Sequence, residues 1–396
     1  MRHGPDHRSA PPTAAGRRAD NAGVKLPRFE LSGWRSILVA LLASRIGLTL
    51  VGLAALSVMP HGVSFLAFPS DAPWLLVWAQ WDAEHYIDIA LDGYSYAPGT
   101  YSNISFFPLY PWLMRAAALA LGQLDRETVT LVGFVISHAA LFVALLYLAA
   151  LVARDFGIEA GRRAVLYVLV FPMTFFLSAV YAESLFLATS VASLFHARRG
   201  EWYRAGIAGG LAAMTRPFGF LLVIPIAIEL YRQRPNLRYA LPSLALVPSG
   251  LAIFFGYSWW RFGDALAYVQ GNNVWGREFA WPWSTLMGFV EGPLIVFGWP
   301  KSIVDLSFIV GMVVTAVAAW RLLPPSYAAF ASIGLFFTLS TGVWYSAPRH
   351  ALALFPLFIV LAIWGQRRYF HWAWLALSVV LAIGFMARFA SGNWIA

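Results

Sequence analysis

Long apolar runs recur through this chain, and they restrict its fold more than any other feature of the sequence. The runs span residues 34–59, 129–153, 164–180, 184–197, 239–261, 302–321, 325–346, 349–365 and 371–390. Hydrophobic residues make up 60% of the chain and charged residues 12%, whereas a soluble domain is typically about half apolar and about a quarter charged. Since one helical crossing of a bilayer takes about 20 residues, the pattern predicts an all-α, polytopic membrane protein.

A further apolar stretch, residues 205–231, is too short for two full crossings of the membrane. The arginine-rich segments before and after it are expected on the same side of the membrane, which requires an even number of crossings between them. Arg216-Pro217 lies midway. We therefore predict two short, broken helices with Arg216 near their outer tip, and roughly eleven crossings in the whole chain.

The N-terminal segment sets the expected orientation. Residues 1–33 are polar and rich in Arg, Pro and Ala, which predicts a disordered cytoplasmic tail ahead of one transmembrane domain over 34–396. The Arg- and Ala-rich composition without cysteine suggests a bacterial protein of the cell membrane, whose outer side is the periplasmic side. A protein of the endoplasmic reticulum would have the same topology, with the lumen outside.

Two long loops are expected on the extracytoplasmic side. Residues 60–103 contain five acidic residues and no Lys or Arg, so the first loop, 60–128, is expected outside. Short apolar runs at 74–81 and 104–121 predict helices that lie along the membrane interface. The second outer loop, 263–300, is rich in tryptophan, which is typical of interfacial anchoring and also suits contact with a sugar or a lipid chain.

Composition also excludes several classes of function. The absence of cysteine excludes disulfides and thiolate metal sites. The net charge of +9 comes from basic residues between apolar runs, so it indicates membrane orientation rather than nucleic-acid binding. There is no P-loop or dinucleotide fingerprint. We predict no cofactor and no metal site, because His85 and Asp92 alone do not make one, although the sequence does not fix a metal requirement.

An acidic stretch, Trp81 to Tyr94 (WDAEHYIDIALDGY), is unusual in so apolar a chain. On a helical projection Glu84, His85, Asp88 and Asp92 share one arc, the ordinary solvated face. Asp82 falls outside that arc, on the side expected to face the protein. Two interpretations stay open at this position: a functional carboxylate such as a general base, or a helix N-cap, where Asp is favoured.

The same stretch resembles a protein family. The pattern W-D-A-x-H-Y-x-x-I-A-x-x-G-Y from Trp81, followed by F-F-P-L-Y-P, is similar to bacterial relatives of the PIG-V mannosyltransferases. Three more blocks match in order: FPMTFFLSAVYAESLFL at 171–187, TRPFGFLLVIP at 215–225 and APRHALALFPLFIVLA at 347–362. The resemblance implies a GT-C membrane glycosyltransferase that uses a polyprenyl-phosphate sugar. It also implies that Asp82 is the catalytic base.

Further candidate residues follow from charge and position. Glu183 lies in a tight outer turn between two apolar runs, where a carboxylate is costly to bury and is therefore a functional candidate. Arg216, Arg349 and His350 are candidates for binding a phosphate, because a guanidinium matches phosphate oxygens. Lys301 is a weaker alternative.

The remaining substrate-binding candidates come from the acidic stretch and are His85, Tyr86 and Asp88. Each has an ordinary alternative. His85 and Tyr86 could be interfacial hydrogen-bonding or anchoring residues, and Asp88 could be a solvated carboxylate. An arginine on the outer side could equally extend to lipid headgroups.

The resemblance implies an inverting transfer of mannose from polyprenyl-phosphate-mannose to a hydroxyl of a lipid- or glycan-linked acceptor, on the extracytoplasmic face. The expected partners are that donor, that acceptor and membrane lipids, with no nucleic acid. Three alternatives remain: a secondary transporter or lipid flippase, a GT-C transferase for another polyprenyl-phosphate sugar such as a pentose, and a non-catalytic subunit. The sequence does not identify the acceptor or the linkage.

Overall fold

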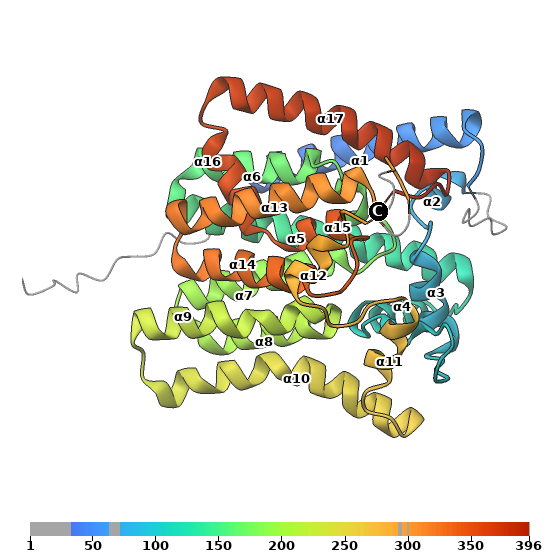
Figure 1. The fold of residues 1–396 in the computed structure, drawn as a ribbon, viewed down its shortest axis with the longest axis horizontal. Helices are drawn as coiled ribbons and strands as arrows, with labels where there is room; N and C mark the ends of the chain where they lie inside the picture. The colour runs from blue at the N-terminus through green and yellow to red at the C-terminus, as the bar shows by residue number, and fades with distance from the viewer. Residues whose placement is uncertain (1–32, 63–71, 292–294, 299–300, 396) are drawn as a thin grey trace, which may run out of the picture.

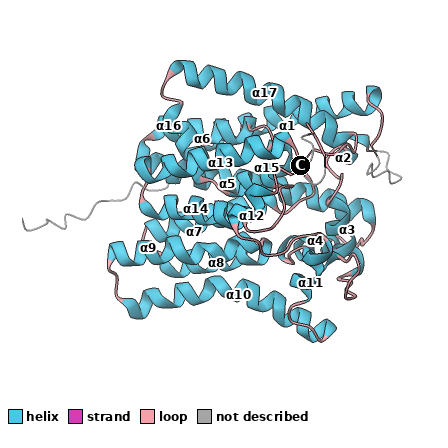
Figure 2. Ribbon diagram, viewed as in Figure 1, coloured by secondary structure: helices cyan, strands magenta, loops and turns pink. Residues whose placement is uncertain are grey.

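The computed structural model describes residues 33–62, 72–291, 295–298 and 301–395. Within these residues the chain forms helices joined by loops and turns, without a strand, as Figure 2 shows. The all-α prediction is confirmed for this part of the chain. The expected disordered tail lies outside the described residues.

Five of the described helices are long and apolar enough to cross a membrane. They are α1 (Trp34–Val58), α5 (Arg126–Phe156), α10 (Leu237–Phe262), α13 (Ile303–Leu322) and α17 (Arg368–Ala390). Two shorter helices, α15 (Ala347–Ala353) and α16 (Pro356–Trp364), meet at 83° and together make a sixth, broken span or a re-entrant loop. Each of these elements coincides with an apolar run of the sequence.

The other expected crossings coincide with shorter helices. They are α6 (Ile158–Val170), α7 (Glu183–Arg198), α8 (Trp202–Thr215), α9 (Val223–Gln233) and α14 (Pro325–Leu339). None reaches the roughly 20 residues of a straight crossing, so the count of eleven stays a prediction. α7 is buried on nearly all sides, which explains how a short helix is tolerated. A helix surrounded by protein does not have to match the thickness of the lipid.

The longer helices run side by side, as Figure 1 shows, with α10 and α17 along opposite edges of the molecule. α7 packs between α5 and α8, and α8 packs on α10. Glycines allow α8 and α10 to approach closely. A Cβ atom on Gly210 would lie 2.6 Å from the Leu246 carbonyl oxygen, and one on Gly250 would lie 2.2 Å from the Gly210 carbonyl oxygen. Small residues at such contacts are typical of helix pairs in membranes.

Short elements gather at one end of the bundle, at the right in Figure 1. One short helix, α12 (Pro282–Met287), lies nearer the middle of the picture, against α14. The elements at the right-hand end are α2 (Pro73–Leu76), α3 (Ala83–Asp92), η1 (Asn103–Ser105), α4 (Leu109–Ala120) and α11 (Ala267–Val274). We call this the cavity end, because a cavity opens here. α4 coincides with the apolar run at 104–121, and its place along the membrane interface stays a prediction. The run 74–81 forms a helix for only four residues, because the segment from Val77 to Gln80 turns inward and is fully buried.

The chain breaks where the sequence predicts. α8 ends at Thr215, and a 3₁₀ turn, η3 (Pro217–Leu222), separates it from α9. Arg216 is extended, with φ −157° and ψ 153°, because a following proline disfavours the helical conformation. The two broken helices are therefore confirmed, with Arg216 at the cavity end of the bundle.

Arginine side chains lie at the opposite end, which we call the arginine-rich end. Arg154, Arg198, Arg232 and Arg321 occur in the last turns of α5, α7, α9 and α13, and Arg368 begins α17.

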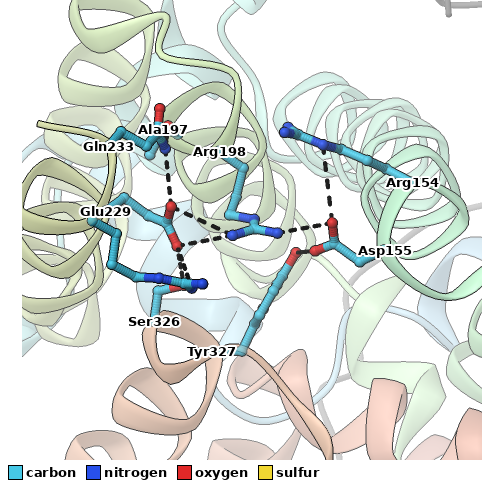
Figure 3. Close-up of polar contacts among 9 residues, drawn as sticks. Arg154, Asp155, Ala197, Arg198, Glu229, Gln233, Ser326 and Tyr327 are labelled. Carbon is cyan, nitrogen blue, oxygen red and sulfur yellow. Dashed lines mark hydrogen bonds and ion pairs between the residues drawn. The ribbon is translucent and has the colours of Figure 1, made fainter. Parts of the chain in front are cut away.

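A buried ionic network at the arginine-rich end joins α5, α7, α9 and α14 (Figure 3). Arg198 lies at its centre, with Nη2 2.9 Å from Asp155 and Nη1 3.2 Å from Glu229. Ser326 donates a hydrogen bond to Glu229, and Tyr327 donates one to Asp155. The network thus ties together four helices where they come closest to one another.

Candidate active site

A cavity of about 1250 Å³ opens at the cavity end. Its wall is built by α3, the break at Arg216, α11 with the loop that follows it, and α15. The ionisable side chains in this wall are Asp82, Glu84, His85, Tyr86, Tyr101, Tyr181, Arg216, Tyr268, Arg277, Glu278, Tyr345, Arg349 and His350. The volume exceeds the roughly 300–1,000 Å³ of ordinary small-molecule sites.

Asp82 lies in this wall at the start of α3. It occupies the N-cap position, but its side chain makes no capping hydrogen bond. The preceding residue, Trp81, has φ 58°, an uncommon conformation for a residue with a side chain. The Tyr181 hydroxyl stabilises this turn, because it accepts from the Asp82 amide and donates to the Gln80 carbonyl, both at 3.0 Å. The Asp82 carboxylate is left available to other partners.

An ionic network connects Asp82 to residues far away in the sequence. Arg349 Nη1 lies 2.5 Å from Asp82 Oδ2, and Arg349 Nη2 lies 2.7 Å from Glu183 Oε1. Arg216 Nη1 lies 2.9 Å from the same Glu183 oxygen. Two carboxylates and two guanidinium groups therefore form one neutral cluster, which we call the cavity network.

Glu183 lies behind the two arginines rather than at the cavity surface. Its side chain is 2% exposed, and it is absent from the cavity wall. It begins α7, directly after the turn that contains Tyr181. Its Oε2 atom has no hydrogen-bond partner among the described residues. This placement differs from the expected direct contact with substrate.

The ionic network controls the charge of Asp82. Burial by itself raises the pKa of this carboxyl group, but the positive charge of Arg349, followed by His85, outweighs burial and holds the pKa below its ordinary value. Asp82 is therefore a carboxylate at neutral pH.

His85 and Tyr86 both reach the cavity wall from α3. The imidazole of His85 stacks on Phe106 with 4.6 Å between ring centroids and meets Trp275 edge-on at 5.8 Å. Tyr86 is 5% exposed and packs edge-on against Phe106 and Tyr110. The structure thus brings both residues to the same cavity as Asp82.

Other predicted residues lie elsewhere. Asp88 forms an ion pair with Arg126 at 2.7 Å and does not line the cavity. Asp92 is exposed at the end of the same helix. Lys301 donates to the carbonyl oxygens of Gly288 and Phe289 and is also absent from the wall.

α15 contributes Arg349 and His350 to the cavity. Its N-cap residue, Ser346, has φ 69°. Together with Trp81, two of the three residues other than glycine that have positive φ in the described chain border this one cavity. Uncommon backbone conformations of this kind cluster at functional sites. His350 is 3% exposed, and its Nδ1 atom has no hydrogen-bond partner among the described residues.

The tryptophan-rich loop divides into two parts. Trp275 lines the cavity. Trp281 and Trp283 stack on each other with 4.9 Å between ring centroids, are more than half exposed, and do not line it. Trp299 lies outside the described residues.

The sequence interpretation missed Arg277, which also lines the cavity. One signal in the sequence could have identified it, since Arg277 is the only Lys or Arg between residues 262 and 300.

In the part of the chain that the structure describes, no group of three His, Asp or Glu side chains is placed to hold a metal ion. Asp82 and Glu183 are instead neutralised by arginines.

Comparison with known proteins identifies relatives in sequence. The sequence profile of the family Mannosyltransferase (PIG-V) matches residues 63–233. GPI alpha-1,6-mannosyltransferase 2 of Mus musculus is 30% identical over 149 residues, which cover 36% of this chain and 29% of the mouse protein. The protein of the same name from Rattus norvegicus is 30% identical over 155 residues, covering 37% and 30% of the two chains. The chain thus spans less than a third of the length of these relatives.

The fold is also similar to that of a solved structure. The crystal structure of ArnT from Cupriavidus metallidurans bound to undecaprenyl phosphate superposes with a TM-score of 0.50 at 14% identity, covering 91% of this chain and 76% of that chain. A likeness at this identity shows the fold, which is the expected GT-C fold. The family profile matches residues 63–233, and the first three sequence blocks of the resemblance lie within this range. The fourth block, 347–362, lies outside it. Residues 63–233 are therefore similar in sequence to the PIG-V mannosyltransferases, and the chain has the GT-C fold.

Proposed function

We propose that the protein is a membrane glycosyltransferase that moves mannose from polyprenyl-phosphate-mannose to a hydroxyl of a lipid- or glycan-linked acceptor. One observation carries this proposal. Asp82 and Arg349, 267 positions apart in the sequence, meet at 2.5 Å in the wall of a large cavity. A carboxylate beside cationic groups is what a displacement at a sugar phosphate needs, because the acceptor loses a proton while the leaving phosphate gains negative charge.

In the proposed reaction the Asp82 carboxylate accepts the proton of the acceptor hydroxyl. The hydroxyl oxygen forms a bond to the anomeric carbon, and the bond between that carbon and the phosphate oxygen breaks. The electron pair leaves with the polyprenyl phosphate, whose charge Arg349, Arg216 and His350 stabilise. A single displacement of this kind inverts the anomeric centre. Glu183 positions the two arginines, while His85 and Tyr86 contact the sugar or the acceptor.

A lipid-linked donor fits the architecture. The cavity lies at the end of the bundle where the short helices α2, α3 and α4 gather. Its volume of about 1250 Å³ leaves room for a sugar phosphate beside an acceptor. The ArnT structure with the same fold contains undecaprenyl phosphate, which supports this donor class for the present chain.

The orientation belongs to the same proposal. Arginines lie in the last turns of α5, α7, α9 and α13, at the end opposite the cavity. Together with the positive-inside rule, this arrangement supports a cavity on the extracytoplasmic face of the cell membrane. The N-terminus would then lie in the cytoplasm, with residues 34–396 as one transmembrane domain.

Broken helices favour one alternative function, that of a transporter or lipid flippase. The bent pair α15–α16 and the interruption between α8 and α9 are features that transporters share. A transporter or lipid flippase would move the lipid-linked sugar across the membrane without breaking the sugar–phosphate bond.

The test compares donors in membranes that contain the protein. Membranes with equal amounts of wild type or Asp82→Asn receive radiolabelled polyprenyl-phosphate-mannose, a nucleotide-linked mannose or a polyprenyl-phosphate pentose. The proposal predicts label in new products only with polyprenyl-phosphate-mannose and only for wild type. Transfer from the pentose donor instead would show that the protein transfers a pentose rather than mannose. Label that crosses the membrane but stays on the polyprenyl phosphate would support the transporter.

A further inference from the structure

Three arginines line the cavity, and they differ in their counterions. Arg216 and Arg349 each pair with a buried carboxylate. Arg277 has no carboxylate within ion-pair distance among the described residues, although the adjacent Glu278 also lines the cavity. An anionic ligand gains most from a cation whose charge is not already neutralised. Of the three arginines, Arg277 is therefore the one expected to bind an anionic ligand most strongly.

The contacts of Arg277 hold its guanidinium group in place without neutralising it. The group lies over the Tyr345 ring, 4.8 Å from the ring centroid. Its Nη2 donates to Ser346 Oγ at 3.1 Å, and its Nε donates to the Tyr345 hydroxyl at 3.4 Å. These contacts use two of the five N–H donors of a guanidinium. Since Arg277 is half-buried in the cavity wall, the others are available to a ligand.

His350 provides an independent indication of a ligand next to Arg277. It follows Ser346, the hydrogen-bond partner of Arg277, by one helical turn and so lies on the same face of α15. Its ring packs on Phe218 with 4.9 Å between centroids, which fixes its orientation. Its Nδ1 atom is buried in the cavity wall without a partner among the described residues. A buried polar atom of this kind usually has a partner when the site is complete.

We propose that Arg277 binds the phosphate of the polyprenyl-phosphate donor, with His350 beside it. The inference rests on the proposed function and deepens it by locating the donor phosphate. The planar guanidinium presents two parallel donors that match two phosphate oxygens. Arg349 still adds its charge to the leaving phosphate, but its donors already face Asp82 and Glu183, so its main contacts position the base. The donor phosphate therefore lies on the α11–α15 side of the cavity.

An ordinary structural role for Arg277 makes a different prediction. Its contacts with Tyr345 and Ser346 could serve only to attach the loop after α11 to α15. Loss of Arg277 would then loosen the cavity wall and weaken every ligand, charged or neutral. The two roles are distinguished by a pair of lipids that differ only in the phosphate.

The experiment measures the dissociation constants of undecaprenyl phosphate and of undecaprenol for purified wild type, Arg277→Gln and Arg261→Gln. Arg261 is an exposed arginine near the end of α10 that does not line the cavity, so it is the matched control. We expect Arg277→Gln to bind the phosphate about 10- to 100-fold more weakly. Its binding of undecaprenol and both affinities of Arg261→Gln should equal those of wild type.

A second measurement uses wild type only and so does not depend on the folding of a variant. Phenylglyoxal modifies accessible arginines, and mass spectrometry reports the modified positions. We expect undecaprenyl phosphate to protect Arg277 but not Arg261, and undecaprenol to protect neither.

Two results would overturn the inference while leaving the proposed function intact. In one, wild type prefers the phosphate but Arg277→Gln binds both lipids as wild type does, or weakens both equally. In the other, Arg277 is modified equally with and without undecaprenyl phosphate. If wild type instead binds undecaprenyl phosphate and undecaprenol equally well, a polyprenyl-phosphate donor is contradicted. Both the proposed function and this inference would then be wrong.

Discussion

Among the residues that the structure describes, a buried ionic network lies at each end of α7. The cavity network includes Glu183, the first residue of this helix, and the network at the arginine-rich end includes Arg198, its last. The helix has 16 residues and is therefore about 24 Å long. In both networks an arginine lies between two carboxylates. Because the two networks contain the same kinds of side chain, the effect of their different surroundings can be compared directly.

The network at the arginine-rich end is closed. Glu229 is 1% exposed and accepts hydrogen bonds from Arg198, Gln233 and Ser326 (Figure 3). Asp155 accepts from Arg198 and Tyr327. None of these residues lines the large cavity. Such a network stabilises the contact of four helices and leaves its carboxylates no access to a substrate.

The cavity network is open on one side. The Asp82 side chain is 30% exposed, and Arg216 and Arg349 form part of the cavity wall. A strained turn at Trp81 precedes the carboxylate. Buried charge by itself therefore does not distinguish a site from a structural contact. A carboxylate that adjoins both a cavity and an uncommon backbone conformation is the better candidate for chemistry.

The largest expected effect comes from breaking the closed network with Glu229→Gln. This change leaves Arg198 with one buried carboxylate instead of two, and loss of a partner in a buried pair costs about 3 kcal/mol or more. We expect a melting temperature several degrees lower in detergent. Mannose transfer per folded molecule should be unchanged, since Glu229 is remote from the cavity.

Glu159→Gln is the control for this prediction. It removes a carboxylate from an exposed pair with Arg162, and exposed pairs of this kind contribute little. A melting temperature of Glu229→Gln equal to that of Glu159→Gln would show that the closed network does not stabilise the bundle.

A matched pair of hydroxyl deletions sharpens the comparison. Tyr327→Phe removes the hydrogen bond to Asp155, and Tyr181→Phe removes those to Gln80 and Asp82. Each should cost about 1–2 kcal/mol of stability. Only Tyr181→Phe should also lower transfer, by about tenfold or more, because small displacements of a catalytic group are costly. Equal transfer rates for the two variants would contradict the role given to the turn at Trp81.

The smallest effect concerns pH. Because Arg349 holds the pKa of Asp82 below its ordinary value, the stability from this carboxylate is fully present above the ordinary pKa of about 4 and is lost only as pH falls through the lower folded value. The difference in melting temperature between wild type and Asp82→Asn should therefore stay constant from about pH 8 to about pH 5. A difference that shrinks within this range would show that the pKa of Asp82 is raised instead.

Much of this architecture could be predicted from the sequence, because apolar runs and their breaks are local signals. The long helices coincide with those runs, and Arg216-Pro217 marks the break before α9 as predicted. The helical projection separated Asp82 from Asp88, which pairs with Arg126 away from the cavity. It also put Glu84 and His85 on the solvated face, whereas both line the cavity.

The remaining features depend on contacts between distant segments. Glu183 faces Arg349 across 166 positions, and nothing local to Glu183 indicates that it lies behind the arginines. The pairing of Asp155 with Tyr327 has the same character, since 172 positions separate them. Arg277 was missed because its loop carries little of the family resemblance, although its isolation from other basic residues was visible in the sequence.

One measurement tests the central claim most directly: mannose transfer from polyprenyl-phosphate-mannose, together with melting temperature, for Asp82→Asn and Asp155→Asn. Both changes remove a carboxylate that faces an arginine. We predict that Asp82→Asn stays folded and loses transfer by at least about 100-fold, whereas Asp155→Asn shows the larger fall in melting temperature and transfers normally per folded molecule. Normal transfer by Asp82→Asn, or loss of transfer by folded Asp155→Asn, would contradict the assignment of chemistry to one network and stability to the other.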